Sequence, residues 1–99
     1  MAEIRVVPNP LNLRSNRELR WPDQNDRLGF LNVPGQATIR IYTELGELVD
    51  TIEHTDGSGD AYWNHTTSAG QLVASGLYIA VITDEETGEQ AMRKFVIIR

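Results

Sequence analysis

The residues of this chain that could take part in chemistry are few. His54 and His65 are the only histidines, and the serines nearest to them lie in loop-like sequence without a nucleophile-elbow motif. A hydrolytic triad needs a nucleophile beside a base that a carboxylate orients, and a zinc site needs three or four ligands. Neither pattern is present. We interpret both histidines as exposed loop residues and expect no catalytic residue.

Two acidic stretches offer oxygen ligands of the kind that calcium prefers. One is Asp23-Gln24-Asn25-Asp26, and the other combines Asp56 with Asp60. Neither follows the spacing of an EF-hand loop, and acidic loop residues are ordinarily solvated turns. We therefore expect no cofactor and no metal ligand, with calcium in a loop left as the open alternative.

Three aromatic residues suggest another kind of site. Trp21, Tyr42 and Tyr62 could form a platform on which sugar rings stack. A sandwich must also fill its interior and edges with such rings, and packing is the preferred interpretation. A carbohydrate-binding module remains an alternative.

The composition excludes several classes of protein. The 99 residues are enough for one domain, 1–99, and 40% of them are hydrophobic. The net charge is -5, and the nine basic residues form no stripe that could neutralise phosphates, so no nucleic acid is expected. The absence of cysteine excludes disulfides and thiolate metal sites. No apolar run reaches the ~20 residues of a membrane span.

The run from residue 37 to residue 83 contains the elements that would have to position any functional residue. Apolar and polar residues alternate there, glycine turns interrupt at short intervals, and no stretch has the 3.6-residue period of a helix. The strand 37–43 turns back at Gly46, which is free to adopt a positive φ, into the strand 48–53. Ala37, Ile39 and Ile41 are expected to share one face of the first strand. On the second strand, Leu48, Asp50 and Ile52 are expected on one face and Val49 and Thr51 on the other.

Shorter strands are predicted on either side of this hairpin. They cover residues 4–7, 27–33 (with Leu28, Phe30 and Asn32 on one face), 61–64 (with Trp63 inward), 77–83 and 90–98. The strand 77–83 is apolar on both faces and should be central. Pro8-Asn9-Pro10 suits an edge or a crossover between sheets, and residues 11–26 read as an irregular connection, with a short strand around 18–21. The pattern predicts an all-β fold, an Ig-like antiparallel β-sandwich of about seven strands.

The order of these features resembles a known group of domains. The chain is similar to the C-terminal Ig-like domains of the type IX secretion sorting family and to the Ig-like domain of the flagellar hook-capping protein. The segments that carry the resemblance are Pro8-Asn9-Pro10, ATIRIY (37–42), LGELV (45–49), Tyr62-Trp63, VASGLY (73–78) and the closing RKFVIIR (93–99).

The resemblance implies a function for the chain. It would be the non-catalytic C-terminal domain of a larger exported bacterial protein, which passes through the periplasm and is secreted or held at the cell surface. A secretion translocon would read the folded domain through two segments. The partner-recognition residues carried over in this way are Val73, Ala74, Ser75, Gly76, Leu77, Tyr78, Arg93, Lys94, Phe95 and Arg99. Within them, Gly76 is expected to adopt a turn conformation that a Cβ would strain.

Other functions stay open alongside this one. The chain could be a structural or adhesive module that packs against domains of its parent protein or assembles into a surface fibre. Self-association through a terminal strand, 4–7 or 91–99, is the specific form of that alternative, because an unpaired strand edge is a template for another chain.

Overall fold

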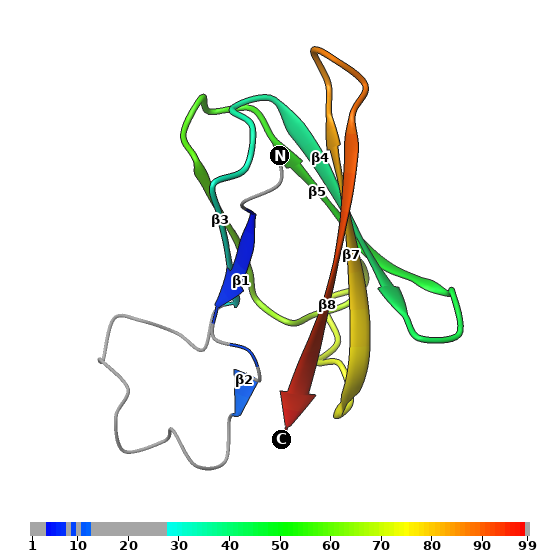
Figure 1. Cartoon of the computed structure of the whole chain (residues 1–99). Coiled ribbons are helices and arrows are strands. Elements are labelled where there is room, and N and C mark those ends of the chain that lie inside the picture. Colours follow the sequence, from blue (N-terminus) through cyan, green and yellow to red (C-terminus); the bar gives the residue numbers. More distant parts are fainter. Residues whose placement is uncertain (1–3, 8, 10, 13–27, 99) are drawn as a thin grey trace.

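The computed structural model describes residues 4–7, 9, 11–12 and 28–98. The regular structure of the described residues consists of β-strands only, which form two sheets (Figure 1). The strands are β1 (Arg5–Val7), β2 (Leu11–Asn12), β3 (Leu28–Leu31), β4 (Ala37–Thr43), β5 (Leu48–His54), β6 (Asp60–Trp63), β7 (Gly76–Asp84) and β8 (Gln90–Ile98). The predicted all-β sandwich is confirmed, with the two-residue β2 as an additional strand.

The order of strands explains why β7 is the most apolar one. The smaller sheet runs β1-β3-β6 and the larger runs β2-β8-β7-β4-β5, so β7 is the middle strand of five. All pairs are antiparallel except β2 with β8, which is parallel. A central strand has sheet on both sides, and its predicted position is confirmed.

The core lies between the two sheets and is built around four aromatic rings. Phe95 lies 6.1 Å from Phe30, 6.0 Å from Trp63 and 5.9 Å from Tyr78, measured between ring centroids. Trp63, predicted to point inward, also directs its indole Nε1 to Asp50 Oδ2 at 3.1 Å and to the Thr66 carbonyl at 3.1 Å. These bonds satisfy the indole donor, so the ring can be buried without a polar penalty.

A β-bulge interrupts the regular alternation of side chains that was predicted for β5. Ile41 pairs with Asp50, but Tyr42 pairs with Leu48, so Val49 is an extra residue on its strand. The extra residue breaks the two-residue alternation. Leu48 is consequently 56% exposed and does not share the face of Ile52 as predicted, whereas Val49 packs against the core.

The Pro-Asn-Pro segment is the predicted crossover between sheets. β1 belongs to the three-stranded sheet and β2 to the five-stranded sheet, with Asn9 between them. The Asn9 side chain donates from Nδ2 to the Lys94 carbonyl at 3.2 Å and accepts from the Val96 amide at 3.1 Å. A side-chain amide thus acts like a strand partner for the edge of β8. The predicted strand at 18–21 lies outside the described residues.

Asn32 and Gly76 both differ from their predictions. Asn32 is not on the core face, because it is exposed and has a φ of 63°, which ends β3. Gly46 has the positive φ predicted for it, 90°, but Gly76 has no positive φ and an added Cβ would meet only Tyr78 Cε2 at 3.9 Å. Gly76 is simply the first residue of β7, so its backbone is strand-like.

Candidate functional site

The segment 73–78, predicted to be recognised by a partner, lies between two surface hollows at one end of the sandwich. The larger hollow measures about 420 Å³ and separates this segment from the start of β5. The smaller measures about 200 Å³ and separates it from the β4–β5 turn. Thr43, Glu47 and Tyr78 line both hollows. The two hollows and the segment between them are here called the recognition end.

Tyr78 holds the recognition end in shape. Its ring is buried and stacks on Phe95 with an interplanar angle of 21°. Its Oη donates to the Ala74 carbonyl at 2.6 Å, which ties the bend at 74–76 to β7. The Val73 side chain is also buried, and its amide donates to the His65 carbonyl at 3.0 Å. Tyr78 and Val73 are therefore buried supports of this surface and are not exposed to a partner.

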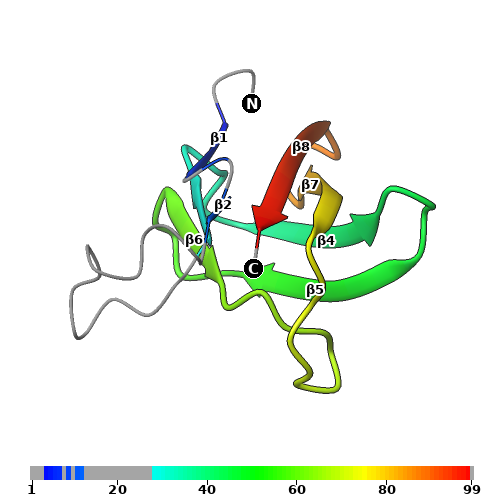
Figure 2. The same cartoon turned by 90° about the horizontal axis from the view of Figure 1, so that it is seen from below.

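The residues that a partner could touch directly are the remaining ones of this segment. Ala74 and Ser75 are exposed, and Gly76 and Leu77 are half-buried. Next to them, the loop 66–72 is fixed by its own backbone bonds, Thr67 N to Gln71 O at 2.7 Å and Gly70 N to Thr67 O at 2.9 Å. The loop thus forms a defined wall for the larger hollow. Figure 2 shows from below how the chain runs from β6 through this loop to β7.

The second predicted recognition segment runs beside the first. Tyr78 pairs with Phe95, and Gly76 pairs with Ile97, so β7 and β8 bring the two segments together. Phe95 is fully in the core, and Arg93 Nε donates to the Ile4 carbonyl at 3.0 Å, which links β8 to the chain entering β1. Lys94 is exposed. Arg99 lies outside the described residues.

Three leucines at the recognition end were missed by reading the sequence. Leu45 is 83% exposed and Leu72 is 65% exposed, and together with Leu48 they border the hollows. A leucine directly before the turn glycine, as in Leu45-Gly46, is the signal that could have found the first of them. Exposed apolar side chains grouped around a hollow are typical of protein interaction sites.

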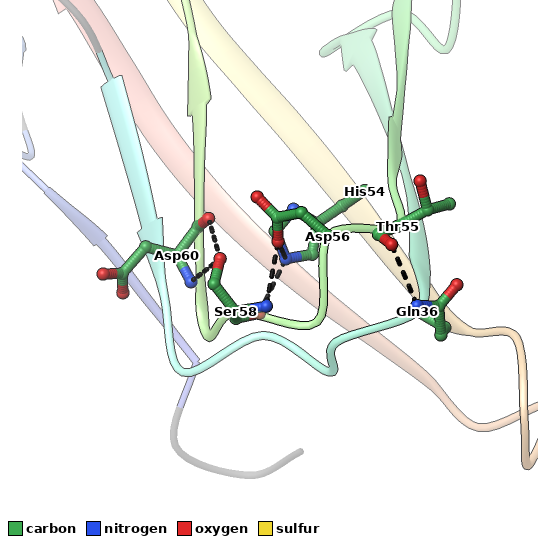
Figure 3. Close-up of polar contacts among 6 residues, drawn as sticks. All are labelled: Gln36, His54, Thr55, Asp56, Ser58 and Asp60. Atoms are coloured by element: carbon green, nitrogen blue, oxygen red, sulfur yellow. Dashed lines mark hydrogen bonds and ion pairs between the residues drawn. The ribbon is translucent and has the colours of Figure 1, made fainter.

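The prediction of two exposed loop histidines is wrong. His54 is the last residue of β5 and is 6% exposed, and His65 is also buried, with a φ of 49°. His54 Nε2 lies 2.7 Å from the Ser58 carbonyl and 3.3 Å from Asp56 Oδ1 (Figure 3). The carbonyl can only accept, so Nε2 carries a hydrogen. The ring fastens the 55–59 loop to the end of β5.

Asp56 and Asp60 both form hydrogen bonds with Ser58 in the same loop. Asp56 Oδ1 accepts from the Ser58 amide at 2.8 Å, and this bond, the Ser58 hydroxyl and the nearby His54 lower the pKa of Asp56 below its ordinary value. The Asp60 backbone carbonyl accepts from Ser58 Oγ at 3.1 Å, and Figure 3 shows its carboxylate pointing away from Asp56. The two carboxylates do not converge. Asp23 and Asp26 lie outside the described residues.

The aromatic platform considered for sugars is not assembled by the described residues. Tyr42 is on β4 of the larger sheet, and Tyr62 is on β6 of the smaller sheet, where its ring lies beside Gly29. Trp21 lies outside the described residues.

In the described part of the chain, no group of three or more histidine, cysteine, aspartate or glutamate side chains is placed to share a metal ion. The same residues include no helix of the length and apolarity that crossing a membrane requires.

Comparison with known proteins gives matches by structure alone. No protein-family model and no curated protein sequence matches the chain. A solved structure of PorZ, an essential bacterial surface component of the type-IX secretion system of Porphyromonas gingivalis, is 23% identical over 99% of this chain, with a TM-score of 0.74. A structure of dimeric latent PorU from the same organism is 20% identical over 96% of this chain, with a TM-score of 0.57.

These matches cover small parts of much longer chains. The present chain corresponds to 12% of the PorZ chain and 9% of the PorU chain. FlgD from P. aeruginosa is 19% identical over 67% of this chain with a TM-score of 0.43, too slight a likeness to argue from. The predicted resemblance is confirmed at the level of fold, because the chain has the architecture of a domain within PorZ and PorU.

Proposed function

We propose that this chain is a non-catalytic C-terminal domain that sorts or anchors an exported bacterial protein at the cell surface through type IX secretion. The observation that carries the proposal is the match of nearly the whole chain, with a TM-score of 0.74, to a part of PorZ. PorZ is itself a surface component of that secretion system. Sharing a fold does not by itself confer a function, so the proposal also rests on the recognition end.

The recognition end supplies the chemistry of a docking site for a protein partner. It combines two hollows, three exposed leucines and a bend whose shape is fixed by the Tyr78–Ala74 bond. A rigid, partly apolar surface binds a partner without a large entropic cost of ordering. We assign the translocon, or a neighbouring domain of the parent protein, to this surface.

The contacts of His54 and Ser58 favour a structural role for both residues over catalysis. His54 Nε2 faces the Ser58 backbone carbonyl, and Ser58 Oγ donates to the Asp60 carbonyl. A serine nucleophile would instead have to place its hydroxyl on the imidazole nitrogen. All of these groups are used to close the 55–59 loop.

The test is a secretion experiment. Residues 1–99 are fused behind a signal peptide and a fluorescent protein in a bacterium that carries type IX secretion, and surface and periplasmic fluorescence are compared. We expect surface fluorescence, and the mass of the exported product shows whether the domain is removed. Retention in the periplasm, with a folded domain and a working translocon, would point instead to a structural module.

Point variants are better suited to this test than a truncation. Deleting residues 93–99 should strand the cargo in the periplasm, but it also removes the core residues Phe95 and Ile97. Ala74→Arg and Lys94→Glu change exposed positions of the two segments and leave the core intact. Glu86→Lys, in the exposed turn far from both segments along β7 and β8, is the matched control.

A further inference from the structure

The outer face of the larger sheet is apolar along its middle. On β7 the residues that alternate with the buried ones are Leu77, Ile79 and Val81, and their register partners on β8 and β4 include Val96, Met92 and Tyr42. Met92 is 57% exposed and the others are half-buried. The outer face of an antiparallel sheet is ordinarily polar. These six residues are called the outer strip.

Two basic residues flank the outer strip in a domain that is otherwise acidic. Arg40 pairs in register with Val81 on one side of β7, and Lys94 pairs with Ile79 on the other. The described residues include only two further basic side chains, Arg5 and Arg93, against ten acidic ones. In the described part of the chain neither Arg40 nor Lys94 forms an ion pair.

The β4–β5 turn is also apolar, but its charged residues are acidic. Residues 44–48, Glu-Leu-Gly-Glu-Leu, are all exposed, with two leucines and two glutamates on one short loop. Thr43 fixes the loop: its amide donates to Glu47 O at 2.9 Å, and its carbonyl accepts from Gly46 N at 2.9 Å. Figure 1 shows this turn projecting from the side of the sandwich. It is called the hairpin tip.

We propose that the hairpin tip of one copy docks on the outer strip of a second copy. Leu45 and Leu48 would cover apolar side chains of the strip, while Glu44 and Glu47 approach Arg40 and Lys94. The occupant is a second copy because this chain itself presents both halves of the contact, matched in apolar character and in charge. The inference does not depend on the proposed sorting function.

The proposed contact between hairpin tip and outer strip is small, so we expect it to be weak. A five-residue loop buries less than the roughly 1,000 Å² that a stable interface needs, so a single contact is weak. Association then appears at high protein concentration, or where many copies are held close together, because linked contacts reinforce one another. Added salt weakens it, since exposed charges are screened.

Sedimentation of the purified domain over a range of concentrations tests the proposal. We expect the weight-average mass to rise with concentration for the unaltered chain. The tip variant Leu45→Ser/Leu48→Ser and the strip variant Arg40→Gln/Lys94→Gln should each remain monomeric. An equimolar mixture of the two variants should form a one-to-one complex, because each retains the half that the other has lost.

Leu72→Ser is the matched control, because the exposure of this leucine lies between those of Leu48 and Leu45 and it belongs to neither surface. It should associate like the unaltered chain, and urea unfolding confirms that all variants are folded. An unaltered chain that stays monomeric at its highest soluble concentration overturns the proposal. So does a mixture of folded variants that fails to associate, or a loss of association in Leu72→Ser equal to that of the tip variant.

Discussion

A single side chain, Asn9, closes part of an edge that a strand would otherwise have to cover. Its amide donates to the Lys94 carbonyl and accepts from the Val96 amide, where the preceding and following prolines have no N–H to offer. The Pro-Asn-Pro motif thus has a physical meaning in this chain. It carries the backbone between sheets while asparagine supplies the hydrogen bonds.

Replacing Asn9 by alanine is expected to lower the free energy of unfolding by about 1 kcal/mol, the usual net value of a hydrogen bond or two at the surface. Amide hydrogen exchange at Val96 should become faster, while the amides between β4 and β7 stay protected. Asn9→Asp keeps the acceptor for Val96 and serves as the control. Unchanged exchange at Val96 in Asn9→Ala would contradict this role.

The carboxylate of Asp56 is expected to make stability depend on acid pH. Its lowered pKa arises first from the Ser58 amide, then from the Ser58 hydroxyl and His54. A depressed pKa stabilises the fold above the pKa of the unfolded chain, about 4, and this contribution disappears as the pH falls through the folded value. Asp56→Asn should therefore be less stable than the unaltered chain at neutral pH and match it in acid.

Urea midpoints at neutral and acid pH measure this difference. The effect is small because the carboxylate is open to solvent. The opposite trend, a variant that matches at neutral pH and diverges in acid, would show that the Ser58 and His54 contacts do not stabilise the ionised form.

At the scale of the element, a glycine in a turn and a glycine that begins a strand should respond differently to alanine. Gly46 has a φ of 90° with no atom near an added Cβ, so its cost is purely one of backbone conformation. Gly46→Ala should destabilise the domain by about 1 to 2 kcal/mol. Gly76→Ala should stay within about 0.5 kcal/mol, because its backbone is strand-like.

Chemical denaturation of the two variants side by side checks this pair. A larger loss for Gly76→Ala than for Gly46→Ala would mean that the turn before β7 is strained in a way that its φ does not show. The comparison distinguishes a glycine that is needed for its positive φ from a glycine that only begins a strand.

The strands differ in how far the sequence predicts them, and the reasons are physical. Alternation alone places Ala37, Ile39 and Ile41 in the core, because β4 is paired in regular register on both sides from Ala37 to Ile41. The same reasoning fails for Leu48, since a bulge depends on the tertiary pairing of β5 with β4. The parallel strand β2 is also missed, because two residues leave no periodicity to read.

The candidate site was predictable in part. The resemblance marks residues 73–78 and 93–99, and the register of β7 and β8 places Gly76 to Tyr78 beside Phe95 to Ile97. Which of them are exposed is a matter of the completed sandwich: Tyr78 and Phe95 are in the core, while Ala74, Ser75 and Lys94 face solvent. The burial of His54 likewise follows from the loop that folds over it.

At the scale of the whole molecule, the two surfaces for which we propose a partner are the recognition end and the outer strip. The recognition end gathers hollows and leucines at one end, and the outer strip lies on the exposed face of the larger sheet. Loops that hold the shape of such surfaces need stable strands behind them, and the stacked Tyr78 and Phe95 provide that support.

The most direct measurement of the central claim is the surface fraction of the fluorescent fusion with and without Ala74→Arg. We predict that the unaltered domain brings the reporter to the surface, that Ala74→Arg retains most of it in the periplasm, and that Glu86→Lys behaves like the unaltered domain. Circular dichroism of each purified domain establishes that it is folded. Equal surface display by the unaltered and Ala74→Arg fusions would contradict recognition at this end of the sandwich, and no surface display by any fusion would contradict the sorting function itself.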